Sequence, residues 1–428
     1  MVKGFSRRHA LGAGTALVLL ANLVIGARIY SQEAAAGKDD QAYENLALFT
    51  RVLEEIRIQY VDEDKTEYQD LIYGALEGML ASLDEHSQFL DPEMYTEMKE
   101  ETSGQFGGLG IVISLQNGIL TVVSPMDDTP GFRAGLTAGD QIIEIDGENM
   151  EGSSLQEAVK KLRGSPGTKV SLKIHRPESR EYLEMEIERA IINVETVKDA
   201  RMLDGGIGYV RITQFSEPTA GALQKALDEL FEQGMQALVL DLRYNPGGLL
   251  TSAVEVSQKF LKKNKVIVST RGRDEKEAQV FRARGREHYA DLPLAVLVNS
   301  GSASASEIVS GALQDHNRAI IIGEKTFGKG SVQSVLPQQD GSAIRLTTSK
   351  YYTPDGRVIH EKGIEPDIRV SMPHEVWQKL MLRKQSTEQT GGEDVKDVQL
   401  ERAVDVLRGI RIFQTQNRKG IFTARSDG

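Results

Sequence analysis

The spacing of apolar positions changes along this chain, and each change predicts a different kind of element. Between Tyr43 and Tyr60 apolar residues recur every three or four positions, which predicts an amphipathic helix. The same spacing predicts a second helix over residues 71–83, and residues 84–95 form the pattern of a capped turn that leads into a third. We therefore expect a helical N-terminal region.

After Gly104 the helical spacing gives way to short β-rich segments. Strands are predicted at residues 110–115, 119–123, 141–145 and 169–175, and short helices at 130–134 and 154–162. This mixture of short elements is typical of a small independent domain.

From Gly205 onward apolar runs alternate with amphipathic segments. Buried strands are predicted at residues 208–212, 237–242, 294–298 and 319–322, and helices at 219–233, 250–262 and 303–314. This alternation predicts a mainly parallel, layered sheet. Residues 271–291 are too charged for a core, so we expect a surface hairpin or flap there. A polar linker at 383–396 and a helix at 398–413 are predicted to follow.

The N-terminus has the pattern of an export segment. Lys3, Arg7 and Arg8 precede an uncharged, mostly apolar run over residues 10–27, and three alanines follow at 34–36. This pattern predicts a signal peptide or an N-terminal membrane anchor over residues 1–36. We expect an exported protein on the periplasmic side of the cytoplasmic membrane, and favour an uncleaved anchor over a released form.

Composition narrows the classes of function. The formal net charge of −11 and the lack of a basic stripe argue against nucleic-acid binding. The chain contains no cysteine, which excludes disulfides, thiol catalysis and cysteine–zinc sites.

The turn after the predicted strand at 294–298 is the first candidate for chemistry. Ser302, Ser304 and Ser306 lie there, where the next helix begins. Free backbone N–H groups at a positive helix end suit a nucleophile whose product carries an oxyanion. Lys329 follows the next strand between two glycines, and a lysine whose pKa is lowered by burial is a competent general base.

Other interpretations compete with this one. A serine at a helix start is most often an N-cap, and a lysine between glycines is most often an exposed loop residue. His316 cannot accept the serine proton, because it is predicted at the other end of the same helix, about 18 Å away. A phosphate-binding loop ending at Lys329 is rejected, since Gly330 replaces the required Ser or Thr and no helix follows.

Residues 104–188 resemble a PDZ domain. The resemblance rests on Gly-Gly-Leu-Gly-Ile-Val-Ile at 107–113 and on Ala-Gly-Leu-Thr-Ala-Gly-Asp at 134–140, in the expected order. It implies that backbone N–H groups around Gly107, Gly108, Leu109 and Gly110 bind a peptide C-terminal carboxylate. The peptide would then add as a strand beside Ile111, Val112 and Ile113.

The remaining motifs resemble the C-terminal processing, or tail-specific, peptidases. They are Asp-Leu-Arg-Tyr-Asn-Pro-Gly-Gly at 241–248, Ser-Ala-Ser-Ala-Ser-Glu at 302–307, Phe-Gly-Lys-Gly-Ser-Val-Gln at 327–333, Tyr-Tyr-Thr-Pro-Asp-Gly at 351–356 and Gly-Ile-Glu-Pro-Asp at 363–367. This resemblance implies a serine endopeptidase with Ser304 as nucleophile, Lys329 as base and Gln333 in support of the lysine.

The family pattern also implies a site for the oxyanion and an organisation of the whole chain. The N–H of Ala305 and that of either Gly247 or Gly248 would bind the oxyanion, since Pro246 has none. The implied fold is α+β and multidomain: helices at 37–103, the inserted PDZ domain, a crotonase-like (ClpP-like) layered α/β peptidase core at 189–382, and a linker, helix and tail at 383–428.

The implied partners are protein substrates with unstructured C-termini, an activating adaptor protein, and further copies of this chain through its terminal helices. No cofactor or metal is implied. Two alternatives stay open: a PDZ-based scaffold with an inactive core, and a crotonase-type acyl transferase, which coenzyme A binding would reveal.

Overall fold

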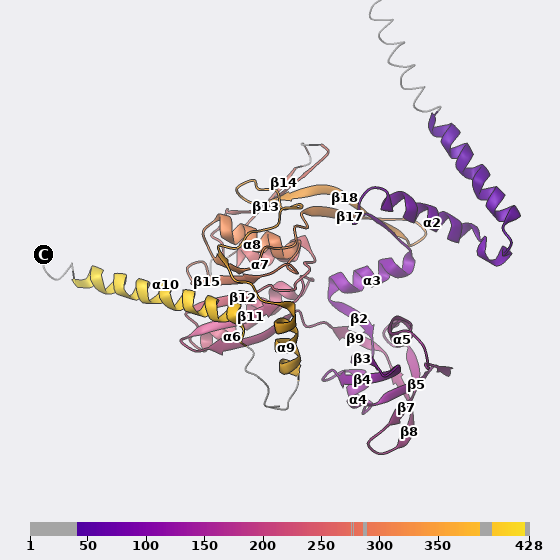
Figure 1. Cartoon of the computed structure of the whole chain (residues 1–428), viewed down its shortest axis with the longest axis horizontal. Helices are drawn as coiled ribbons and strands as arrows, with labels where there is room; N and C mark the ends of the chain where they lie inside the picture. The colour runs from indigo at the N-terminus through magenta and orange to yellow at the C-terminus, as the bar shows by residue number, and fades with distance from the viewer. Residues whose placement is uncertain (1–40, 275, 277, 286–288, 386–395, 424–428) are drawn as a thin grey trace, which may run out of the picture. The chain divides into compact units, whose positions relative to one another are not determined.

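A computed structural model describes residues 41–274, 276, 278–285, 289–385 and 396–423. The chain divides into two compact units, Met1–Leu83 and Asp84–Gly428 (Figure 1). The predicted export segment and most of the predicted polar linker lie outside the described residues. Within those ranges, no helix has both the length and the apolar character needed to cross a membrane.

The first unit is helical, as predicted. It consists of a helix over residues 41–59, the 3-10 helix η1 (Glu63–Lys65) and α2 (Tyr68–Ala81). The apolar stripe of the first helix is solvent-exposed, since Leu46, Phe49, Val52 and Ile56 are 40–61% exposed. Self-association through this helix stays a prediction.

The second unit begins with elements that lead into the PDZ-like segment. Strand β1 (Gln88–Leu90) precedes α3 (Pro92–Ser103), whose N-cap Asp91 accepts a hydrogen bond from Met94 N. Strand β2 (Gln105–Gly108) pairs with β9 (Ala190–Asn193) in a separate two-stranded sheet. This pair frames the segment, because its strands come immediately before and after it in sequence.

Between β2 and β9 lies a sheet with the strand order β3-β4-β5-β7-β8. Its elements are β3 (Ile111–Gln116), β4 (Ile119–Pro125), α4 (Pro130–Arg133), β5 (Gln141–Ile145), β6 (Glu148–Asn149), α5 (Leu155–Leu162), β7 (Lys169–Arg176) and β8 (Glu181–Glu188). A capping box between Ser154 and Glu157 starts α5. Strand β3 stands at the edge of the sheet, so one of its sides is unpaired by any strand of the described chain.

The core contains a six-stranded sheet with the order β10-β11-β12-β15-β16-β19. Its strands are β10 (Val197–Leu203), β11 (Ile207–Ile212), β12 (Ala237–Asp241), β15 (Leu294–Val298), β16 (Ile320–Gly323) and β19 (Ile368–Arg369). All neighbours from β11 to β19 are parallel, which confirms the predicted mainly parallel sheet.

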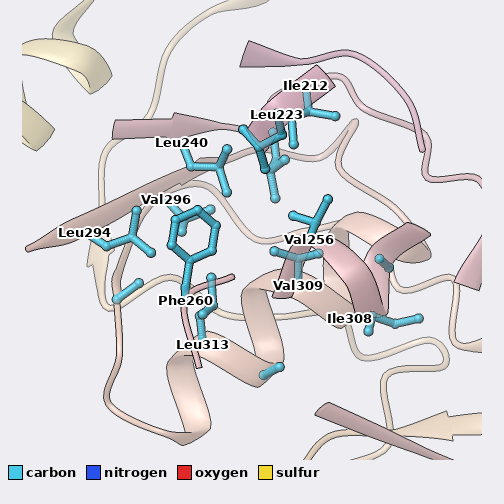
Figure 2. Packing of buried hydrophobic residues seen from close by; sticks show 14 of the residues in the cluster. Ile212, Leu223, Leu240, Val256, Phe260, Leu294, Val296, Ile308, Val309 and Leu313 are labelled. Atoms are coloured by element: carbon cyan, nitrogen blue, oxygen red, sulfur yellow. The ribbon is translucent and has the colours of Figure 1, made fainter. Parts of the chain in front are cut away.

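Helices cover both faces of this sheet. Alternate strand residues such as Leu240 and Val296 pack among α6 (Thr219–Glu232), α7 (Leu250–Gln258) and α8 (Ala305–Asp315), as Figure 2 shows for α7 and α8. The residues between them, including Val239, pack against the C-terminal helix α10 (Val398–Thr423; yellow in Figure 1). Burial on both faces explains why these strands read as continuous apolar runs.

A second sheet, whose strand β13 contacts α7 and α8, has the order β1-β18-β13-β14, with β17 also paired to β18. It contains β13 (Val266–Gly272), β14 (Gln279–Arg282), β17 (Ser331–Pro337) and β18 (Ala343–Tyr352); α9 (His374–Gln385) follows later in the chain. The surface hairpin predicted at 271–291 is present in part, as β13–β14. Its first strand begins earlier, at Val266, because Ile267 and Val268 are buried.

Candidate active site

The turn between β15 and α8 carries the predicted nucleophile. Ser304 immediately precedes α8, and its backbone has φ 52° and ψ −110°. An ordinary N-cap serine has an extended conformation with negative φ. A positive φ at a residue with a side chain costs of order 1–3 kcal/mol and is concentrated at functional sites. The strained backbone therefore distinguishes Ser304 from a serine that only caps a helix.

The three serines of this turn have different environments. The hydroxyl of Ser302 donates to the carbonyl of Leu242 at 2.8 Å, and that of Ser306 donates to the carbonyl of Asn245 at 2.9 Å. Both side chains are fully buried, whereas Ser304 is partly exposed. A substrate can therefore reach Ser304, while its two neighbours hold the turn in place.

A second turn, after β12, packs directly against the first. Asn245 connects the two: its carbonyl accepts from Ala303 N at 3.0 Å as well as from Ser306, and its side-chain Nδ2 donates to the carbonyl of Ile212 at 2.9 Å. Asn245 is completely buried. The sequence identified this stretch as a family motif, but it gave no sign that Asn245 joins the two turns.

The structure distinguishes between the two predicted glycine donors. The N–H of Gly247 donates to Asn245 Oδ1 at 2.9 Å, so it is already engaged. The N–H groups of Gly248 and Ala305 have no acceptor among the described residues. A Cβ at Gly247 would lie 2.8 Å from Ser304 Cβ, so only glycine fits against Ser304. Gly248 and Ala305 are therefore the better pair of donors for an oxyanion.

Lys329 lies on the loop between β16 and β17 and is half-buried. Burial lowers the pKa of its ammonium group, the positive charge of Arg345 lowers it further, and Glu85 opposes both. A lower pKa increases the neutral fraction of the lysine at physiological pH. The loop thus supplies the property that a general base needs.

The predicted support from Gln333 takes a different form in this structure. Its side-chain Nε2 donates to Ser331 Oγ at 2.8 Å, and no described hydrogen bond connects it to Lys329. Ser304 Oγ and Lys329 Nζ are likewise not hydrogen-bonded to each other within the described residues. The predicted contacts among Ser304, Lys329 and Gln333 are therefore not formed in this structure.

Glu307 joins the nucleophile turn to the lysine loop. Its Oε2 accepts from Ser304 N at 2.8 Å and from Lys329 N at 2.9 Å. Its Oε1 accepts from Gly328 N at 2.7 Å and from Thr326 Oγ1 at 2.5 Å. The side chain is fully buried. Burial raises the pKa of this carboxyl group, against these four hydrogen bonds, which lower it. Glu307 is therefore a positioning residue that holds the backbone of Ser304 and of Lys329 in place.

We expect Glu307→Gln to lower kcat about 10- to 100-fold, with a smaller change in KM, because errors near 1 Å in catalytic geometry cost about that much. Glutamine keeps the shape, but its NH2 group is a donor and cannot accept from two of the four donors. Steady-state kinetics on a peptide substrate measures the effect. The control is Glu361→Gln, a charge removed from a side chain 86% exposed. An unchanged kcat in Glu307→Gln, with the protein folded, would contradict the positioning role.

A buried charge network holds the turn after β12, which contains Gly247 and Gly248. The Arg243 guanidinium is paired with Asp241 at 2.6 Å and with Asp397, just before α10, at 2.8 Å. Burial alone would raise the pKa of Asp241, but Arg243 and the Tyr209 hydroxyl lower it. Loss of one member of such a buried set leaves an unpaired charge, so the C-terminal helix is coupled to the turn.

The predicted peptide-binding residues fall on two elements. Gly107 and Gly108 lie in β2 and pair with β9, while Ile111, Val112 and Ile113 begin the edge strand β3. Leu109 and Gly110 connect the two strands, and their carbonyls accept from Gly131 N and Met126 N, both at 2.8 Å. No described hydrogen bond engages the N–H groups of Leu109 or Gly110.

The competing histidine interpretation receives no support from the geometry of His316. His316 caps the far end of α8, and its Nε2 lies 2.7 Å from the carbonyl of Val266. His288 lies outside the described residues. Within the part of the chain that the structure describes, no group of three or more His, Asp or Glu side chains is arranged to hold a metal ion.

Two known protein families match parts of this chain. The model of peptidase family S41 matches residues 206–370, which include both turns and the lysine loop. A PDZ domain model matches residues 121–176, within the sheet β3–β8.

Relatives match over most of the chain. A carboxy-terminal-processing protease of Bartonella bacilliformis is 45% identical over 81% of this chain and 79% of its own length. The carboxy-terminal processing protease CtpB of Bacillus subtilis is 36% identical over 91% of this chain and 80% of its own length. Among solved structures, a photosystem II D1 C-terminal processing protease aligns with a TM-score of 0.44 and 31% identity, covering 76% of this chain and 92% of that one.

Proposed function

Because this chain belongs to the carboxy-terminal processing proteases of peptidase family S41, we propose that it is an exported serine endopeptidase with a Ser304–Lys329 dyad that selects unstructured C-terminal tails through its PDZ domain. The observation that carries the proposal is the Glu307 carboxylate, which accepts hydrogen bonds from the backbone N–H groups of both Ser304 and Lys329. A helix capping box accounts for the Ser304 contact alone, whereas the contacts to Gly328 N and Lys329 N bind the lysine loop to the same carboxylate.

The proposed reaction is acyl transfer. Ser304 Oγ attacks the peptide carbonyl carbon while Lys329 Nζ accepts the hydroxyl proton. The oxyanion is held by the N–H groups of Gly248 and Ala305. Lys329 then gives the proton to the leaving amine as the C–N bond breaks, and a water molecule releases the acyl group by the same steps in reverse order.

Tail recognition is proposed to occur at the open edge of β3. An extended peptide can pair with this edge, and its terminal carboxylate can reach the N–H groups of Leu109 and Gly110. Val112, which is 47% exposed, offers an apolar contact beside this edge. Apolar C-terminal residues are therefore the expected ligands.

Tail binding is also proposed to complete the active site. Support comes from Gln333, whose amide is bonded to Ser331 rather than to Lys329. A ligand shifts such an equilibrium only if it binds the completed state more tightly. The β2–β9 pair, which joins the PDZ segment to the core, is the connection through which binding would act.

The layered arrangement of helices over a parallel sheet supports a crotonase-like core.

The test uses protein that begins after residue 36 and an unstructured protein ending in either apolar residues or two serines. We expect kcat/KM for the apolar tail to be at least about tenfold higher, since a correctly filled apolar pocket contributes about that factor. A free apolar-tail peptide should accelerate cleavage of the serine-ended protein. Tail binding without cleavage would favour the scaffold alternative, and equal cleavage of both proteins would contradict tail selection.

A further inference from the structure

A groove of about 430 Å³ lies along strands β13 and β18, and the N–H of Tyr351, between two of its lining residues, donates to the carbonyl of Gly330 in the lysine loop at 2.7 Å. The groove is lined by backbone and side chains of Arg271, Gly272, Arg273, Thr347, Thr348, Ser349, Lys350 and Tyr352. Three of these residues are basic, and the lining contains no carboxylate. This is an unusual lining for a chain whose net charge is −11.

Two basic residues of the groove, Arg271 and Lys350, lie on the same face of the sheet as Gln333. Directly opposed residues of an antiparallel pair share a face. Gln333 is opposite Thr347, and Ser331, which Gln333 contacts, is opposite Lys350. Lys350 is in turn opposite Arg271 on β13. The intervening residue Val332 packs into the core, so the face with Gln333 is turned the other way.

The basic side chains of the groove are available to a ligand. The Arg271 guanidinium lies over the Tyr352 ring, 4.4 Å from its centroid, which orients the group and leaves its charge unneutralised. No ion pair involves Arg271, Arg273 or Lys350 among the described residues. Arg345, opposite Val335, adds a further positive charge to the same face.

We propose that this groove binds an acidic side chain of the substrate, an Asp or Glu near the bond that is cut. The inference rests on the proposed peptidase function and adds a charge preference to it. The ligand is an internal side chain rather than the terminal carboxylate, because Lys350 of the groove pairs with Ser331 at the start of β17, directly after the lysine loop, and not with the open edge of β3. A planar carboxylate fits the fork of the Arg271 guanidinium, and the nearby threonine and serine hydroxyls can donate to it.

The experiment uses internally quenched peptides in which one Glu is moved through the positions on each side of the cut, each compared with Gln at that position. For the wild type we expect, at one or two positions, a KM about three- to tenfold lower with Glu, since the groove is open to water and its ion pairs are weak. The preference should shrink at roughly 0.5 M salt, because exposed charges are screened.

The double variant Arg271→Gln/Lys350→Gln should bring the Glu-to-Gln ratio of KM to about one. The matched control, Lys225→Gln/Lys262→Gln, removes the same charge from exposed side chains elsewhere on the core and should keep the ratio. No preference at any position, or a preference that survives in the Arg271/Lys350 variant, would overturn the proposal.

Failure of this proposal is distinguishable from failure of the peptidase function. If the wild type cuts the Glu and Gln peptides with the same KM, only the groove is misassigned. If it cuts no peptide, fluorescence anisotropy of the same labelled peptides decides the question by binding alone. Tighter binding of the Glu peptide that is lost in the Arg271/Lys350 variant supports the groove, and equal binding of both peptides overturns it.

Discussion

Ser304→Ala is expected to lower kcat/KM for peptide cleavage by at least about a thousandfold, because loss of a nucleophile removes the covalent route and leaves only binding and oxyanion stabilisation. The variant should stay folded. Alanine removes one hydroxyl from a partly exposed side chain, whose backbone contacts to Glu307 are unaffected. Cleavage kinetics and covalent labelling by a fluorophosphonate, measured together, check the prediction.

Ser302→Ala and Ser306→Ala are matched controls in the same turn. Each removes a buried hydroxyl that donates to a backbone carbonyl, at Leu242 and Asn245 respectively. Each should cost about 1 kcal/mol in the free energy of unfolding and still permit labelling. Labelling that persists in Ser304→Ala but disappears in one of these variants would show that the nucleophile is a different serine.

The sequence predicted the core strands well because their pattern has a simple physical origin. Strand β15 of the core was predicted with the bounds observed, Leu294–Val298, as was strand β5 of the PDZ-like sheet, Gln141–Ile145. The central strands of the core are apolar on both faces, so their runs end sharply at polar turns. Only the charged end of strand β13, from Arg271, was included in the predicted surface hairpin. Its first residues, among them Ile267 and Val268, are buried and were not included.

The residues of the candidate site that belong to sequence motifs were predicted to lie together. Ser304, Lys329 and the family motif at 241–248 lie on adjacent turns, as the order of a parallel sheet requires. The roles of Glu307 and Asn245 were missed, because in sequence Glu307 resembles an ordinary acidic residue in the first turn of a helix. The Arg243–Asp397 pair was beyond reach, since its partners are 154 positions apart and no local pattern links them.

Which of the two glycines has a free N–H for an oxyanion could not be predicted from the sequence. As glycines, Gly247 and Gly248 have the same conformational freedom in the sequence, and both have positive φ in the structure. They are told apart only by the Asn245 side chain, which takes the N–H of Gly247. Assignments of this kind depend on which donors are already used, and that accounting requires the folded backbone.

Lys329→Ala is expected to lower kcat by about 10²- to 10⁴-fold, the usual contribution of a general base. In the wild type, kcat should rise with pH as Lys329 loses its proton, because only the neutral amine accepts the proton of Ser304. Burial and Arg345 lower the pKa of Lys329, so this rise should occur at a lower pH than for an ordinary lysine. The rise should be absent from the residual activity of Lys329→Ala.

Two further variants separate proton acceptance from charge. Lys329→Arg keeps a positive charge that is never given up in proteins, so it should be about as inactive as Lys329→Ala. Lys325→Ala is the control on the same loop: its side chain is 51% exposed and paired with Glu365, so kcat and its pH dependence should be retained. Near-normal kcat in Lys329→Arg would mean that the lysine acts through its charge, and Ser304 would then need a different base.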